Sequence, residues 1–214
     1  MKALILVNGE LYKPDVLRRR IRAEPFNLVL GADAGARYAD TLNVTLDAII
    51  GDLDSLSVLG EQGIGNTGFV PYPSEKDETD LELALLYAVK QGIDQIVMVG
   101  VMGGRMDMTI ANILLITRAS LSSCRIKMWH GEQTGWIIKP PGEDIFGHPG
   151  DTVSFIPLGG DASGITTDGL KYSLKDEKLT FGPARGISNV LERPSAHIKV
   201  SEGLLLAVHI PGRA

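Results

Sequence analysis

The stretch AIIGDLDSL, residues 48–56, places two aspartates directly after an apolar run and a glycine. The apolar run predicts a strand that is buried on both faces. Asp52 and Asp54 stand two positions apart, so in an extended chain their side chains project to the same side. Two ionised carboxylates this close repel each other unless a cation lies between them. The stretch therefore indicates either a polar surface turn, with Ser55 capping the next helix, or the binding site of a cation.

Similar apolar runs lie on both sides of this stretch and alternate with helix-like segments. Unbroken apolar strands that alternate with helices are typical of a mostly parallel sheet covered on both faces. Ligands of such sheets bind at the carboxyl ends of the strands, where polar residues follow the apolar runs here. The predicted segments are strands at 3–9, 26–33, 46–52, 67–73 and 95–101, and helices at 13–24, 34–42, 79–92 and 108–121.

The pattern changes after about residue 125, where short apolar strands alternate with Gly, Pro, Asp and Ser and no helical pattern remains. Among them is the segment 170–174, LKYSL. Strands of this kind are typical of an all-β sandwich or barrel. We therefore expect an α/β domain at residues 1–130 and a β-sandwich domain at residues 131–214.

Composition narrows the function classes. The 214 residues are 44% hydrophobic and 22% charged, with a net charge of −5, which argues against broad binding to nucleic acid or to an anionic membrane. Cys124 is the only cysteine, so no intrachain disulfide can form. No stretch approaches the roughly 20 apolar residues of a membrane span, and we expect a cytoplasmic protein.

A second acidic stretch is PSEKDETD at 73–80. Thr79 begins a capping box, which predicts that a helix starts here with Asp80 in its first turn. Acidic residues are favoured at helix N-termini for electrostatic reasons alone. Alternatively, Lys76 and Asp77 place a phosphate-binding cation and a metal ligand in the same loop.

A third stretch, GGRMD at 103–107, combines two glycines with an arginine and an aspartate. Glycines let the backbone approach a ligand closely, and Arg105 can form a bidentate pair with phosphate oxygens. The alternative is a glycine turn in which Asp107 caps a helix. Asp33 adds another acidic residue at the end of a predicted strand. Four acidic strand ends together indicate a magnesium–nucleotide site.

Taken in order, the stretches ADAGARY, GDLDS, SEKDETD, GGRMD, GITTDGLKYSL and SNV resemble the thiamine pyrophosphokinase (thiamine diphosphokinase) family over nearly the whole chain. The resemblance implies a nucleotide-binding catalytic domain at 1–130, a thiamine-binding domain at 131–214, and a homodimer with sites between subunits. It also implies Mg²⁺-dependent transfer of the pyrophosphoryl group of ATP to the hydroxyl of thiamine, which releases AMP.

The same resemblance assigns residues to the site. Mg²⁺ would be bound by Asp52, Asp54 and Asp80. The other side chains expected around the nucleotide and its phosphates are Asp33, Ser55, Lys76, Asp77, Thr79, Arg105 and Asp107. The expected thiamine-binding residues are Tyr172, Ser188 and Asn189. Tyr172 either stacks on the cationic heterocycle or packs in the core of the sandwich.

The chain departs from the family pattern at two places. Met108 stands where the family commonly carries a histidine, and Val190 and Leu191 stand where a polar residue is frequent. Transfer to another small alcohol and a catalytically silent nucleotide or thiamine sensor therefore stay open as alternatives. A haloacid dehalogenase-type phosphatase is disfavoured, because its D-x-D motif follows the first strand and has Thr or Val where Leu56 stands here.

Overall fold

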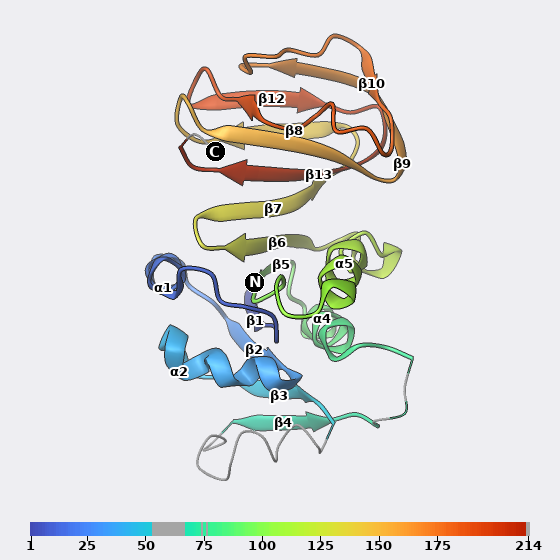
Figure 1. Ribbon diagram of the computed structural model, residues 1–214. Coiled ribbons are helices and arrows are strands. Elements are labelled where there is room, and N and C mark those ends of the chain that lie inside the picture. Colours follow the sequence, from blue (N-terminus) through green and yellow to red (C-terminus); the bar gives the residue numbers. More distant parts are fainter. Residues whose placement is uncertain (53–66, 74, 76, 213–214) are drawn as a thin grey trace. The chain divides into compact units, whose positions relative to one another are not determined.

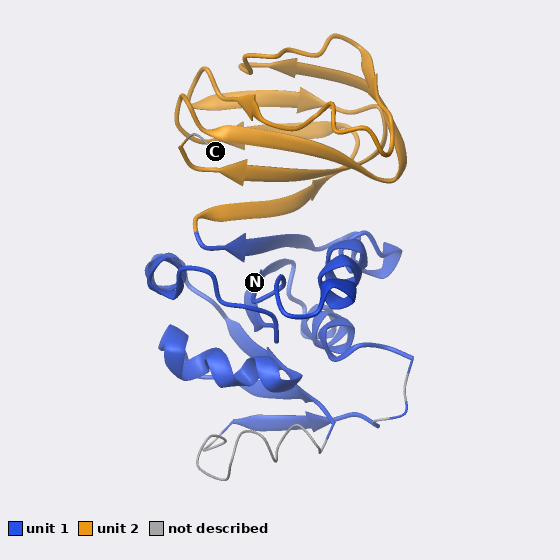
Figure 2. Cartoon of the chain, viewed as in Figure 1, with its two compact units in different colours: residues 1–131 blue, residues 132–214 orange. Residues whose placement is uncertain are grey.

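The computed structural model describes residues 1–52, 67–73, 75 and 77–212. The chain divides into two compact units, unit 1 (Met1–Gly131) and unit 2 (Glu132–Ala214), shown in Figure 2. Three predicted site residues, Asp54, Ser55 and Lys76, lie outside the described residues. In the part of the chain that is described, no helix is long and apolar enough to cross a membrane.

Unit 1 alternates strands and helices as predicted (Figure 1). Its elements are β1 (Lys2–Leu6), α1 (Pro14–Arg22), β2 (Leu28–Ala32), η1 (Asp33–Arg37), α2 (Tyr38–Leu42), β3 (Ala48–Gly51), β4 (Gly68–Pro71), α4 (Asp80–Lys90), β5 (Gln95–Val99), α5 (Met106–Leu115), η2 (Ala119–Leu121) and β6 (Arg125–His130).

All four predicted helices are present with shifted bounds, and two of them differ most from the prediction. The segment predicted as one helix at 34–42 is a 3₁₀ helix followed by a short α-helix. The helix predicted at 108–121 begins two residues earlier and ends at Leu115. It ends there because the N–H groups of Thr117 and Arg118 bond to carbonyl oxygens three residues back, which tightens the chain into a turn.

The sheet of unit 1 has the order β4-β3-β2-β1-β5-β6, and every neighbouring pair is parallel. The chain runs outward from β1 to β4, then crosses back past β1 to form β5 and β6. In Figure 1, α1 and α2 cover one face of this sheet and α4 and α5 cover the other. The direction of strand order reverses between β1 and β5, and in such sheets this is where ligands bind.

Side chains of β1 show that both faces of the sheet are covered. All four residues from Ala3 to Leu6 are fully buried. Leu4 and Leu6 pack in one cluster with Leu17 and Ile21 of α1. Successive side chains of a strand alternate between faces, so the other residues of β1 face the side where α4 contacts β1, β2 and β3.

In unit 2 the elements are all strands within the described residues: β7 (Gln133–Ile138), β8 (Gly142–Phe146), β9 (Thr152–Asp168), β10 (Glu177–Leu179), β11 (Asn189–Val190), β12 (Ser195–Lys199) and β13 (Glu202–Ile210). They pair antiparallel in the order β7-β13-β9-β12-β8, and β10 and β11 also pair with β9.

The 17-residue strand β9 joins the two halves of unit 2. It pairs first with β13 and, near its end, with β12. The hydrophobic core of unit 2 is formed by side chains of these strands and includes Phe155, Ile165, Ile198 and Leu205. The predicted fold class, a mostly parallel α/β part followed by a β-sandwich, is confirmed.

The strand predicted at 170–174 is wrong. Leu170 makes only an isolated bridge to Leu191, and Lys171 and Tyr172 form a bend. The strand β8, at Gly142–Phe146, had no counterpart in the prediction.

Candidate functional site

Several acidic residues that the sequence singles out lie at one edge of the sheet of unit 1. Asp33 follows β2 directly, Asp52 follows β3, and Asp77 and Asp80 follow β4. Because these strands are parallel and adjacent, their carboxyl ends meet at the same edge. The carboxyl ends of these strands therefore share one edge, as predicted, and the gathering of the acidic side chains there stays a prediction.

Asp33 and Asp52 come from neighbouring strands. Ala32 is in register with Ile50, so Asp33 lies beside Gly51, the residue that precedes Asp52. Asp33 has a φ of 51°, a left-handed conformation that Asp adopts more readily than most residues, and it turns the chain from β2 into η1. Both residues are half-buried. Carboxylate oxygens so placed are the donors that Mg²⁺ prefers.

The predicted metal cluster is not tested, because Asp54 is not described. Among the residues that the structure describes, no three His, Cys, Asp or Glu side chains form a group that could hold a metal ion. The assignment of Asp52, Asp54 and Asp80 to a metal thus stays a prediction.

Thr79 begins α4, as the capping box predicts. Its Oγ1 accepts a hydrogen bond of 3.2 Å from the backbone N–H of Glu82, which satisfies one of the free donors of the first turn. The carboxylate of Glu82 forms an ion pair with Arg118. The hydroxyl of Thr79 can still donate its own hydrogen, so helix capping and ligand binding are compatible at this residue.

The loops after β1 and β5 are joined by backbone hydrogen bonds at the point where the strand order reverses. The N–H of Gly9 donates to Gly100 O (2.7 Å), and the N–H of Glu10 donates to Met102 O (2.7 Å). A carboxylate oxygen of Glu10 accepts from the N–H of Gly104 (3.2 Å). Tyr38 donates its hydroxyl to the carbonyl of Gly9. These hydrogen bonds join the loop after β1 to the loop after β5, and the two loops form one rigid rim.

Sequence reasoning did not include the β1 exit in the site. The signal was present: an Asn-Gly pair, residues 8 and 9, follows an apolar run. The Asn-Gly pair lies next to the loop after β5 only because β1 pairs with β5. The order of strands cannot be predicted from the alternation of apolar segments.

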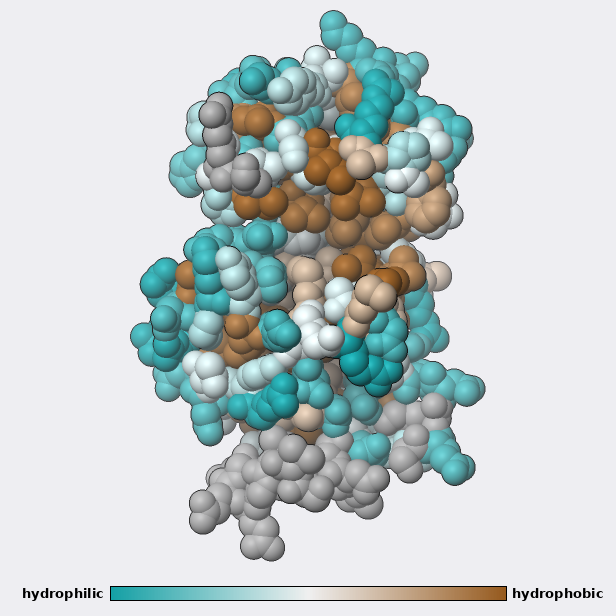
Figure 3. Space-filling model, in the orientation of Figure 1, coloured by the Kyte–Doolittle hydropathy of each residue, from teal (hydrophilic) through white to brown (hydrophobic). Residues whose placement is uncertain are grey.

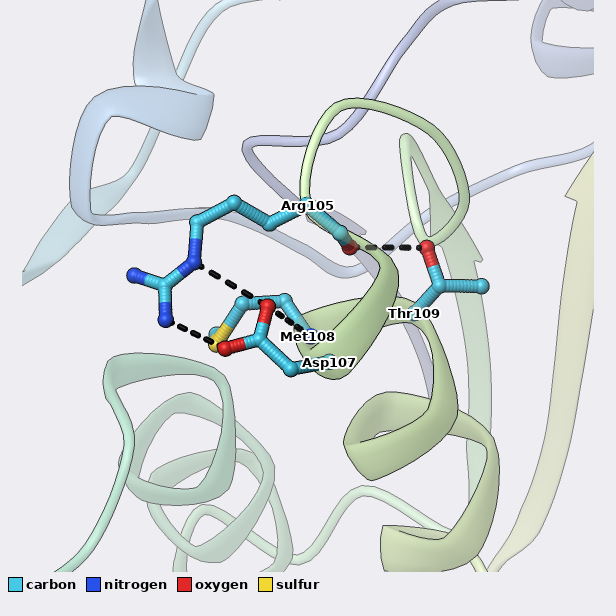
Figure 4. A network of polar contacts seen from close by, with 4 residues as sticks. All are labelled: Arg105, Asp107, Met108 and Thr109. Carbon is cyan, nitrogen blue, oxygen red and sulfur yellow. Dashed lines mark hydrogen bonds and ion pairs between the residues drawn. The ribbon is translucent and has the colours of Figure 1, made fainter.

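Arg105 and Asp107 form a paired group at the start of α5 (Figure 4). Nε of Arg105 donates to Oδ1 of Asp107 (3.1 Å) and Nη2 donates to Oδ2 (2.5 Å). Oδ1 also accepts from the N–H of Met108 (2.9 Å). The hydrogen bond from Arg105, and after it that from Met108, lower the pKa of Asp107 below its ordinary value.

This arrangement changes what Asp107 can do. A carboxylate with a lowered pKa and with both oxygens engaged is a weak proton acceptor, so it is poorly suited to act as a general base. Its partner Arg105 has a raised pKa because of the hydrogen bond to Asp107 and is exposed over 74% of its side chain. The pair presents a guanidinium to solvent.

In unit 2 the predicted thiamine-binding residues lie together on two backbone segments. The N–H of Tyr172 donates to Oδ1 of Asn189 (3.0 Å), and Nδ2 of Asn189 donates to Tyr172 O (2.7 Å). Asn189 is buried, and its Oδ1 also accepts from the N–H of Val190. Its amide therefore ties the two segments together, which also explains why residues 171–172 bend.

Tyr172 does not pack in the core of the sandwich, since 59% of it is exposed. The Nζ of Lys171 lies 5.5 Å from the centre of its ring, within the range of a cation–π contact. Ser188 is also exposed, has a φ of 61°, and donates its N–H to Oγ of Ser154 (3.1 Å). The interpretation of Tyr172 as a core residue of the sandwich is therefore wrong, and its stacking on the cationic heterocycle stays a prediction.

Two family models match the chain, in order. The one described as thiamin pyrophosphokinase, catalytic domain, matches residues 22–128, and the one described as thiamin pyrophosphokinase, vitamin B1 binding domain, matches residues 137–205. The first match begins within α1 and ends in β6, and the second lies within unit 2.

Individual relatives agree with these matches. The chain is 30% identical to a thiamine pyrophosphokinase of Bacillus subtilis over 185 residues, which are 85% of this chain and 86% of the relative. It is 24% identical to thiamine pyrophosphokinase 1 of Oryza sativa over 77% of this chain and 66% of that one. A crystal structure of the Bacillus subtilis protein superposes with a TM-score of 0.84, at 25% identity and with 99% of each chain covered.

Proposed function

The chain belongs to the thiamine pyrophosphokinase family, and from this premise we propose that it transfers the pyrophosphoryl group of ATP to the hydroxyl of thiamine. The products are thiamine diphosphate and AMP. The observation that carries the proposal is the pair of family matches, catalytic and vitamin B1-binding, which follow one another along one chain. We assign nucleotide binding to residues 1–130 and thiamine binding to residues 131–214.

The nucleotide binds, in this proposal, along the carboxyl edge of the sheet of unit 1. Asp33 contributes polar atoms at the end of β2, Thr79 contributes a hydroxyl at the start of α4, and Arg105 contributes a guanidinium after β5. Between the ends of β3 and β5 lie three strand spacings, about 14 Å. An edge of this length accommodates a nucleotide whose phosphates extend from the aspartates towards Arg105. Ser55 and Lys76 are further proposed contacts from the part of the chain that is not described.

Mg²⁺ would be held by Asp52, Asp54 and Asp80. The donor set fits this metal, because all three donors are carboxylates, and Asp52 lies at the end of β3 while Asp80 lies in the first turn of α4. When bound, Mg²⁺ neutralises charge on the phosphates. The contribution of the protein is to hold Asp52 and Asp80 on two elements that contact each other, β3 and α4.

Thiamine binds on unit 2 beside Tyr172. The exposed ring of Tyr172 lies next to an ammonium group, as described above, so its face can also receive the cationic thiazolium ring of thiamine. Ser188 supplies an exposed hydroxyl near the same segments. We propose that Asn189 contributes indirectly, because both atoms of its amide bind backbone groups.

In the reaction, the hydroxyl oxygen of thiamine attacks the β-phosphorus in line with the oxygen that bridges to the α-phosphorus. That bond breaks as the new bond forms, and AMP leaves with the bridging oxygen while the hydroxyl proton is released. The protein supplies alignment and positive charge, which are the main requirements of phosphoryl transfer. Arg105 and Lys76 stabilise charge on the phosphates. Of the two carboxylates considered as a base, Asp77 is favoured, since Asp107 is engaged with Arg105.

We also propose that the enzyme is a homodimer in the cytoplasm, as the family resemblance implies. A stripe of exposed apolar side chains on α5, Met106, Ile110 and Leu114, supports a protein contact, because residues four apart share one face of a helix. Figure 3 shows apolar surface in the region of α5. Light scattering after size-exclusion chromatography measures the mass, and a monomer at micromolar concentration contradicts the proposal.

The function is tested with ATP, Mg²⁺ and thiamine, by measuring AMP and thiamine diphosphate together. We expect the two products in a 1:1 ratio and loss of both when EDTA is added. Asp52→Asn should lower kcat/KM for ATP by about a hundredfold or more, the usual effect of removing one charge-stabilising group. Asp40→Asn is the matched control, since Asp40 is an exposed aspartate of α2 outside the proposed site.

Four outcomes would contradict the proposal. Formation of AMP without thiamine diphosphate would indicate that the protein is a nucleotide hydrolase. ATP binding without any turnover would favour a sensor, and turnover of another small alcohol in preference to thiamine would change the acceptor. A trapped acyl-phosphate on an aspartate would indicate the phosphatase mechanism instead.

A further inference from the structure

We propose that Asp107 is a positioning residue that holds the guanidinium of Arg105 by one side, so that its opposite side binds a phosphate of the nucleotide. This inference rests on the function proposed above, because it assigns the phosphate to the ATP of that reaction. It gives the aspartate of the GGRMD stretch a role that is neither metal binding nor proton transfer.

The geometry of the pair leaves the outer side of the guanidinium open. Nε and Nη2 of Arg105 bind the two oxygens of Asp107, which is the side-on arrangement of an arginine–carboxylate pair. The remaining hydrogens, those of Nη1 and the second one of Nη2, point away from the carboxylate. Within the described part of the chain, Nη1 has no acceptor, and Arg105 is 74% exposed. The open side matches two oxygens of a phosphate.

Asp107 has a second anchor that keeps it in place. Its Oδ1 accepts the N–H of Met108 in the first turn of α5, where carboxylates are stabilised by free N–H groups. An incoming phosphate that displaced Asp107 would have to replace this contact as well as both contacts to Arg105. Binding on the open side breaks none of them. The phosphate is therefore expected to add to the pair and not to exchange with it.

The backbone that carries Arg105 is also fixed. Its carbonyl oxygen accepts from the N–H of Thr109 (3.1 Å) and from Oγ1 of Thr109 (3.2 Å), as Figure 4 shows for the hydroxyl. The same hydroxyl oxygen accepts from the N–H of Gly103 (3.2 Å). These hydrogen bonds thus hold the backbone of the glycine loop, of Arg105 and of the first turn of α5 together. A long arginine normally loses rotamer freedom when it binds a ligand, and here much of that loss precedes binding.

Two effects of Asp107 on ATP binding have opposite signs, which makes the proposal testable. Its negative charge weakens the attraction between Arg105 and a phosphate, so if this effect dominates, removal of the charge strengthens ATP binding. Its hydrogen bonds orient the guanidinium, so if orientation dominates, removal weakens ATP binding. Both side chains are exposed and the charge effect is screened by water and salt. We therefore expect orientation to dominate.

The experiment is a double-mutant cycle on ATP affinity, measured by isothermal titration calorimetry with ATP and Mg²⁺. Asp107→Asn should raise the Kd for ATP about tenfold, the effect of losing one charge-assisted hydrogen bond. In an Arg105→Lys background the same change should alter the Kd less than twofold, because an ammonium cannot be held by the side-on pair. Asp15→Asn, in the exposed pair with Arg18 on α1, is the matched control and should leave the Kd unchanged.

Turnover separates positioning from proton transfer. If Asp107 positions Arg105, Asp107→Asn raises KM for ATP more than it lowers kcat. A large loss of kcat with unchanged KM would identify a general base and overturn the proposal. So would tighter or unchanged ATP binding in Asp107→Asn, or an effect of equal size in both backgrounds. A wild-type protein that binds ATP but makes no thiamine diphosphate contradicts the proposed function alone, whereas absence of ATP binding contradicts both.

Discussion

The junction of the β1 and β5 loops depends on a glycine that no other residue can replace without displacing backbone. Gly100 is buried and has a φ of 74°. A Cβ atom at this position would lie 2.2 Å from the carbonyl oxygen of Val7, far inside van der Waals contact. Val7 is held in turn by its N–H, which donates to Val99 O (2.9 Å), so it has little freedom to move. We predict that Gly100→Ala strongly destabilises unit 1.

The magnitude follows from two costs. The left-handed backbone conformation costs a non-glycine residue about 1 kcal/mol. Relieving the overlap with Val7 requires a backbone shift, for which overpacking in well-packed regions suggests about 2 kcal/mol more. The free energy of unfolding should therefore fall by about 3 kcal/mol. Gly104 is a matched control, because its φ of 70° is nearly the same but a Cβ atom there would meet nothing within 4 Å. Gly104→Ala should cost only about 1 kcal/mol.

Urea unfolding measures both variants in a Trp136→Phe background, so that fluorescence reports only Trp129. Trp129 is buried in unit 1, whereas Trp136 belongs to unit 2. The two variants should differ by about 2 kcal/mol with the same dependence on urea. Equal destabilisation by the two substitutions would refute the steric argument, and an unchanged Gly100→Ala variant would refute the close approach of the two loops as well.

Three further predictions concern a helix cap, a thiol and a buried carboxylate. Thr79→Ala should lower the free energy of unfolding by about 1 kcal/mol and Thr79→Ser should largely retain it, as chemical denaturation can measure. Burial raises the pKa of Cys124 to about 11, so iodoacetamide at pH 8 should label it on the order of a hundredfold more slowly than it labels the urea-unfolded chain; equal rates would contradict this. Burial alone would raise the pKa of Asp151, but hydrogen bonds from two backbone N–H groups and from His209 bring it below its ordinary value. Its ionised form thus stabilises the fold above about pH 4. Asp151→Asn should lower the free energy of unfolding by about 2 kcal/mol at pH 7, but only slightly once the pH falls below the lowered pKa of Asp151. Urea unfolding at a series of pH values can test this.

The fold was largely predictable because its decisive signals are local. The strands β1, β2, β3 and β5 are apolar runs that are mostly buried, as in Ala3–Leu6, and helices follow β1, β2, β4 and β5. Parallel pairing then follows from the alternation of strands and helices. The order of the strands does not, because it depends on which strands pair across long separations. The rim formed by Gly9, Glu10 and Gly100 was missed for that reason.

Site residues divide in the same way. Sequence patterns singled out Arg105 and Asp107, and the family resemblance singled out Tyr172 and Asn189, as candidate site residues, but the role of each depends on which of its atoms are already hydrogen-bonded. The amide of Asn189 binds backbone groups, whereas the face of Tyr172 is exposed. A sequence motif contains both the residues that hold a site in place and the residues that touch its ligand. The motif alone does not show which residue has which role.

This distinction determines how variants of the site should be interpreted. Substituting Asn189 removes two hydrogen bonds that fix the segment carrying Tyr172, so a loss of thiamine binding in Asn189→Ala would not identify a ligand contact. Tyr172→Phe and Tyr172→Leu give the sharper comparison. Phenylalanine keeps an aromatic face for a cation and leucine keeps only apolar area, so if the ring stacks on thiamine, leucine alone should raise KM for thiamine, by about fivefold or more. Equal effects of the two substitutions would place thiamine away from this ring.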